Sequence, residues 1–118
     1  MGYMRHHAIV VTSWSDEHIV AAHSVAKTIF STVSEIITSP VNRYKSFVVA
    51  PDGSKEGWDD SNSGDVRRAN FVMWLDGQRF EDDSSPLAWA EIQYGDDELE
   101  TKIVNDSDAR RRLTGEST

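Results

Sequence analysis

Residues 5–30, RHHAIVVTSWSDEHIVAAHSVAKTIF, decide how the rest of the chain can be arranged. The run from His6 to Thr12 is short, rich in β-branched residues and bounded by polar ones, which indicates a central strand covered on both faces. Ser13 and Ser15 are good helix N-caps, and the two acidic residues after Ser15 suit the positive end of a helix dipole. The stretch therefore predicts a buried strand, a short polar turn and a helix that begins near residue 15.

The apolar residues of this helix recur at spacings of three and four, which is the pattern of one buried stripe on an amphipathic helix. His23 falls within the stripe, and we interpret it as a core histidine with a hydrogen-bond partner. After Thr32 the helical period ends. Residues 35–40, EIITSP, predict a short strand, and residues 44–50, YKSFVVA, predict its antiparallel partner. The apolar residues of the helix stripe are Ile19, Ala22, Ala26, Ile29, Phe30 and Val33.

The middle of the chain is predicted to hold a long irregular loop over residues 51–64. We expect the loop to be ordered around Trp58, because burying an indole offsets part of the entropy of holding the loop glycines still. Ser63 or Asp65 would cap a second helix that ends near Asp76, with Gly77 as its stop. Residues 87–94 and 101–104 predict a strand and a final edge strand. The main apolar stripe of the second helix is predicted to be Val66, Ala69, Val72 and Met73, widened by Phe71, Trp74 and Leu75.

The order of these elements predicts the fold. Strand, helix, strand, strand, helix, strand is the split β-α-β arrangement, so we expect an α+β, ferredoxin-like β-α-β-β-α-β sandwich with one extra C-terminal edge strand. Residues 1–104 would form the single domain and residues 105–118 a polar tail. The sheet face without helices would bear Trp89 or Tyr94. Because such a face is too apolar to stay exposed, we expect a second subunit, the loops or a ligand to close it, and hence a homo-oligomer.

Composition narrows the class of protein. The absence of cysteine excludes disulfides and thiolate metal sites and suits a reducing cytosol, so a cytoplasmic location is expected. No apolar run approaches the ~18 residues of a membrane helix, and the N-terminus lacks the apolar core of a signal peptide, which predicts no membrane partner. The net charge of −8 is concentrated in an acidic strip within residues 80–100, which argues against simple nucleic-acid binding. The strip consists of Glu81, Asp82, Asp83, Glu91, Asp96, Asp97, Glu98 and Glu100.

Motifs for catalysis, metals and cofactors are not recognised in the sequence. His6 and His7 point to opposite faces of a strand and cannot chelate one metal ion, and no histidine follows residue 24. A calcium loop that began at Asp59 would have Asn70 where its last glutamate belongs. Neither a dinucleotide-binding glycine pattern nor a P-loop occurs. We therefore expect no cofactor and favour a protein that is not an enzyme, although carboxylates and histidines could still converge in space.

The remaining chemistry is that of an anion site. The first strand–helix turn supplies N–H donors, and Trp14 and Trp58 could stack on a planar ring or plug the core. Arg67 and Arg68 are predicted in the first turn of the second helix, where an acidic ligand would offset their conflict with the dipole. Salt bridges to Glu56, Asp59 or Asp60 are the alternative. The predicted ligand-binding residues are Arg5, Ser13, Trp14, Ser15, Lys55, Trp58 and Arg67.

Three segments, RHHAIVVTSW (5–14), APDGSKEGW (50–58) and EIQYGDD (91–97), resemble small proteins encoded in tailed-phage genomes, and the resemblance covers most of residues 1–104. It implies a setting in the host cytoplasm, where such proteins are often interaction or ligand-binding proteins directed at the host. One expectation is a non-enzymatic protein that sequesters a small anionic ligand, such as a host immune signalling nucleotide. The alternative is an acidic protein-interaction module whose acidic strip inhibits a basic host protein.

Overall fold

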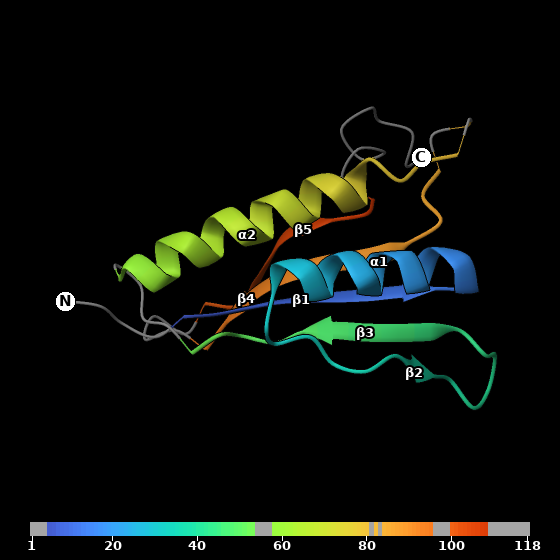
Figure 1. Cartoon of the computed structure of the whole chain (residues 1–118), viewed down its shortest axis with the longest axis horizontal. Coiled ribbons are helices and arrows are strands. Elements are labelled where there is room, and N and C mark those ends of the chain that lie inside the picture. Colours follow the sequence, from blue (N-terminus) through green and yellow to red (C-terminus); the bar gives the residue numbers. More distant parts are fainter. Residues whose placement is uncertain (1–4, 54–57, 81, 83, 96–99, 109–118) are drawn as a thin grey trace.

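The computed structural model in Figure 1 describes residues 5–53, 58–80, 82, 84–95 and 100–108. All pairs of strands are antiparallel, and the order in the sheet is β2-β3-β1-β4-β5. The predicted ferredoxin-like α+β arrangement is therefore confirmed, with β5 as the extra edge strand. The elements are β1 (His6–Ser13), α1 (Asp16–Ile29), β2 (Ile37–Thr38), β3 (Lys45–Val49), α2 (Asp59–Asp76), β4 (Ala88–Tyr94) and β5 (Lys102–Asp106).

Both helices lie on one face of the sheet (Figure 1), and the hydrophobic core fills the space between the two layers. The predicted stripe of α1 is confirmed, because Ile19, Ala22 and Ala26 are fully buried in this core. His23 also behaves as predicted: its Nε2 lies 2.9 Å from the Ser34 carbonyl oxygen. Each fully buried large side chain contributes roughly 1.5 to 3 kcal/mol relative to exposure. The largest such side chains are Ile9, Val11, Ile19, Phe47, Phe71, Leu75 and Leu87.

The helices cover β1 on one face only, whereas the prediction had both faces covered. Ile9 and Val11 face the helices and are inaccessible to solvent, while on the other face Ala8 is buried and Val10 and Thr12 are only partly buried. The same alternation corrects the placement of Trp89. Trp89 pairs with Val11 and lies in the core, so the open face of the sheet carries Tyr94 but not Trp89.

α2 begins at Asp59, with Trp58 as its N-cap residue, and not at Ser63 or Asp65 as predicted. The second part of the expected loop is therefore helical. Asp59 and Asp60 occupy the first turn, where negative charge is stabilised by the helix dipole, and this explains why a polar run forms a helix. Trp58 is 49% exposed, so its indole is only half buried, which is less than the prediction of a loop organised around its burial assumed. Residues 54–57 of that loop lie outside the described part of the chain.

The buried stripe of α2 also differs from the prediction. Gly64, Arg68, Phe71 and Leu75 face inward, whereas Val66 and Met73 are exposed. Counting apolar residues missed this face, because a glycine and an arginine occupy two of its positions. The helix ends at Asp76 with Gly77 as C-cap, as predicted.

The last strand is longer than predicted, since β5 continues through Asn105 and Asp106 into the segment expected to be a polar tail. Asn105 Nδ2 donates to Glu91 Oε1 across the strand pair at 3.0 Å, which explains the extension. No helix in the described part of the chain has the length and apolarity needed to cross a membrane.

Candidate functional site

A cavity of about 230 Å³ lies where β1 begins and β3 ends, between the C-terminal end of α1 and the N-terminal half of α2. Ile9, Ile29, Phe30 and Val49 form its apolar wall. Four segments, residues 7–9, 29–32, 49–52 and 64–68, therefore contribute to one small site, which none of them could form alone. The polar lining consists of His7, Ser31, Thr32, Asp52, Arg67 and Arg68.

Arg68 is held in place by a buried network, named here the Arg68 network. Its guanidinium donates to the carboxylate of Asp65 one turn earlier in α2, and Arg68 Nε lies 3.7 Å from Glu91 Oε2 on β4. Glu91 in turn accepts the hydrogen bond from Asn105. Arg68 and Glu91 are both buried, and two carboxylates offset the guanidinium charge. The Arg68 network thus ties α2 to β4 and β5 and gives the cavity a fixed wall.

Arg67 differs from its neighbour. It is exposed, lines the cavity, and makes no ion pair with any residue that the structure describes, Asp59 and Asp60 included. It stands in the third turn of α2 and not in the first, because the helix begins at Asp59. A guanidinium with uncommitted donors matches the planar geometry of carboxylate and phosphate oxygens. Arg67 is therefore the strongest candidate for contacting an anion.

Gly64 allows the cavity wall to pack closely. A Cβ atom at this position would lie 3.0 Å from Asp52 Oδ2 and 3.2 Å from Arg68 Nη1, which is tighter than ordinary contact. The absence of a side chain lets both charged groups approach the helix backbone. Because carboxylates offset the charge of Arg68, Arg67 is the guanidinium of the lining that has no ion pair in the described part of the chain.

Gln93 adds an unpaired donor next to the cavity. It is the register partner of His7 on the helix-covered face of the sheet, so the two side chains are neighbours across the strand pair. Gln93 is buried, and its Nε2 has no hydrogen-bond partner in the described part of the chain. A buried donor without a partner costs about 1 to 3 kcal/mol. An oxygen from a ligand or a water molecule that reached it would remove this penalty.

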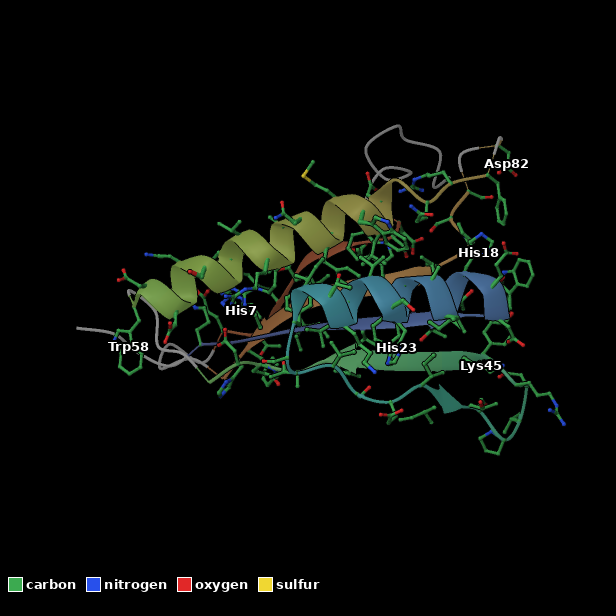
Figure 2. The ribbon with its side chains drawn as sticks, in the orientation of Figure 1. His7, His18, His23, Lys45, Trp58 and Asp82 are labelled. Carbon is green, nitrogen blue, oxygen red and sulfur yellow. The ribbon has the colours of Figure 1, made fainter. Side chains whose placement is uncertain are left out.

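Some of the predicted ligand-binding residues lie at the cavity end of the molecule. Arg67 lines the cavity, and Arg5 directly precedes β1. Figure 2 shows Trp58 and His7 toward this end, with the indole at the start of α2. Trp58 precedes Arg67 by nine residues, which corresponds to about 13 Å along the helix axis. Lys55 lies outside the described residues.

Ser13, Trp14 and Ser15 lie at the opposite end of β1, roughly 20 Å from His7. In Figure 2, His18 and Lys45 lie at this end of the molecule, remote from Trp58 and His7. Ser13 Oγ donates to the Pro86 carbonyl at 2.6 Å, and Ser15 Oγ caps α1 by accepting from the His18 backbone N–H. The single site predicted from all these residues is therefore not formed, and the cavity lies at the C-terminal end of α1 instead of its N-terminus.

The acidic strip does not form one exposed surface. Glu91 is buried in the Arg68 network, whereas Asp82 and Glu100 are exposed. Residues 81, 83 and 96–98 lie outside the described part of the chain. The residue count within 80–100 therefore overstates the acidity available to a partner by at least one carboxylate.

Sequence reasoning missed Thr32, Asp52 and Gly64, which line the cavity, and Gln93, which is the register partner of the lining residue His7. A signal existed for Gly64 alone, because it continues the spacing of Arg68, Phe71 and Leu75 at four, three and four residues. The other three depend on segments that meet only after folding. Among the described residues no three His, Asp or Glu side chains are grouped as a metal site requires.

Comparison with known proteins does not assign a family, since no family model, no curated protein and no solved structure matches the chain. The fold and the cavity define only the class: an α+β, ferredoxin-like domain with a small cavity beside α2 that the exposed Arg67 lines.

Proposed function

We propose that the protein binds a small anionic ligand in this cavity and sequesters it without transforming it. The observation that supports this most directly is Arg67, an exposed guanidinium at the cavity without an ion pair in the described part of the chain. Arg68 beside it is neutralised by carboxylates and holds the wall, so the two arginines have different roles. A charged hydrogen bond from Arg67 would contribute about 1.5 to 3 kcal/mol to binding.

The size of the cavity limits what enters it. At about 230 Å³ it is smaller than the ~300 to 1,000 Å³ of sites that enclose whole drug-sized ligands, so it would hold the anionic group and little more. The nine residues from Trp58 to Arg67 make about two and a half helical turns. The remainder of the ligand would therefore pass around the start of α2 to reach the half-exposed Trp58, whose ring can stack on a planar base. A nucleotide combines these two features. Given the resemblance to tailed-phage proteins, a host immune signalling nucleotide is the member of this class that we propose to test first.

Sequestration without catalysis is proposed because the hydroxyl group of Thr32 and the pair formed by Ser15 and His18 are engaged in structural hydrogen bonds. In the cavity, Thr32 Oγ1 donates to the Ala50 carbonyl at 2.8 Å. The contact of 2.7 Å between Ser15 Oγ and His18 Nδ1 lies at the opposite end of the sheet, where Ser15 caps α1. A serine–histidine pair there would not reach a ligand bound beside Arg67.

The proposal is tested by calorimetric titration of the protein with a panel of linear and cyclic nucleotides and inorganic phosphate. Arg67→Gln should weaken binding about 10- to 150-fold, which corresponds to the loss of one charged hydrogen bond. Arg43→Gln is the matched control, because it removes the same charge from an exposed position between β2 and β3. Trp58→Ala should weaken the binding of nucleotides but not that of phosphate.

Two results would contradict the proposal. One is a wild-type protein that binds no member of the panel, together with native mass spectrometry that shows no small bound mass after purification from infected host cells. The other is an equal loss of affinity for Arg67→Gln and Arg43→Gln, since that would show a general effect of charge and no specific site. A host protein captured through residues 80–100 would then support the interaction module instead.

A further inference from the structure

The sheet has one face that neither helix covers, named here the open face. Strand register places its residues together, because Ala8 pairs with Ile92, Val10 pairs with both Ala90 and Val48, and Ile92 pairs with Ile103. These side chains come from four adjacent strands. Ile103 remains 63% exposed, whereas Ala8 is buried and the other four side chains are partly buried. The centre of the open face consists of Ala8, Val10, Val48, Ala90, Ile92 and Ile103.

The open face lacks the composition of a solvated sheet surface. An antiparallel sheet with one wet face normally alternates apolar and polar residues along each strand. β1 and β4 break that rule, because Ala8, Val10, Ala90 and Ile92 face away from the helices. In the described strands, the register places one side chain of the Asp, Glu, Lys and Arg types on this face, namely Asp106 at the β5 edge. By comparison, 27% of the chain is charged. Depletion of charge is typical of the core of an interface.

We propose that a second copy of this chain covers the open face in a two-fold symmetric dimer. A patch whose strand residues carry so little charge offers little to select a partner of opposite charge, whereas it can pack against itself about a two-fold axis. Beside Ala88 and Ala90 lies a shallow hollow of about 450 Å³, with Asp106 and Asp108 in its lining, which leaves room for side chains of the facing sheet. The dimer needs no residue of the cavity beside Arg67, which opens on the other side of the sheet.

The area of the open face sets the expected strength of the dimer. Five strands of two to eight residues, at about 3.3 Å per residue and about 4.8 Å per strand, give a footprint of roughly 430 Å² per copy. Stable specific interfaces begin at about 600 Å² per partner. The open face is smaller than this, so we expect a weak, reversible dimer with a dissociation constant in the micromolar range.

The net charge of the chain distinguishes a second copy from a basic protein or peptide as the partner that covers the open face. Each copy carries −8, so dimerisation brings two acidic molecules together through a face that is itself almost uncharged. Salt screens this repulsion, and the dimer should become tighter as the ionic strength rises from about 0.05 to 0.5 M. Binding of a basic protein or peptide would show the opposite dependence.

Sedimentation velocity from about 2 to 200 µM at both salt concentrations tests the proposal. Ile103→Glu should weaken the dimer at least tenfold, because each interface would then bury two added charges. Met73→Glu is the matched control: it adds the same charge at a side chain that is 72% exposed on α2, compared with 63% for Ile103. We expect it to change the dissociation constant less than about twofold. Ala90→Glu provides a second disruption on β4 if Ile103→Glu impairs folding, which circular dichroism would reveal.

A wild-type protein that stays monomeric at every concentration and salt would overturn the proposal. So would equal effects of Ile103→Glu and Met73→Glu, or a dimer that salt weakens. Arg67→Gln should leave the sedimentation profile unchanged, so a failure of the dimer and a failure of the ligand proposal can be told apart.

Discussion

The Arg68 network allows a sharp test of how the fold holds a buried charge. The side chains of Arg68 and Glu91 are 9% and 10% exposed, so removing one partner leaves the other charge buried. Arg68→Leu leaves Glu91 with a hydrogen bond from Asn105 and should cost about 3 to 5 kcal/mol in the free energy of unfolding. Glu91→Leu should cost less, about 2 to 3 kcal/mol, because Arg68 keeps its contact with the half-exposed Asp65.

The double variant carries the decisive information. Arg68→Leu with Glu91→Leu removes both charges and fills the space with apolar side chains, so we expect a net loss below about 1.5 kcal/mol. The coupling free energy of the cycle should therefore exceed roughly 3 kcal/mol. Urea unfolding followed by circular dichroism and tryptophan fluorescence measures all four proteins, and an unchanged dependence on urea would confirm that the same transition is compared. If the double variant lost as much stability as the two single variants together, the charges would not be a coupled buried pair and the reasoning would be refuted.

Two further predictions concern the helices. Gly64→Ala should not raise the free energy of unfolding, although alanine in a helix interior is favoured over glycine by about 1 kcal/mol, because the new Cβ would lie 3.0 Å from Asp52 Oδ2. Ser63→Ala, at an exposed position of the same helix, is the control and should be neutral or stabilising. Urea unfolding measures both variants. A clear gain for Gly64→Ala would show that the cavity wall is not tightly packed there. Ser15→Ala should lower the free energy of unfolding by about 1 kcal/mol, because the hydrogen bond that caps α1 is lost. Ser15→Asp should retain most of the stability that the cap provides. Equal losses of stability in the two variants would argue against capping.

The site was only partly predictable, and the reason is visible in particular residues. Arg67 could be selected as a basic side chain without an obvious partner, and it does line the cavity. Ser13 and Ser15 were selected by the same chemistry, but the length of β1 separates them from Arg67. Because Ser13 and Ser15 are close in sequence to the N-terminus of α1, we expected the ligand site at that end of the sheet. The cavity lies at the other end. Nothing local indicated that Asp52, Gly64 and His7 would meet.

What the sequence determined by itself is the order of the elements and thereby the fold. The short apolar run in residues 6–12, the stripe of α1 and the other β-branched runs are local patterns, and each indicates which backbone conformation can bury its own apolar residues. The tertiary structure alone decided which face of α2 turns inward, since Phe71 and Leu75 outweigh Val66 and Met73 only when they meet the core. It also decided that Arg68 is paired with Glu91 and that Trp89 lies beneath the helices. These outcomes depend on residues far apart in the chain, and periodicity contains no information about such neighbours.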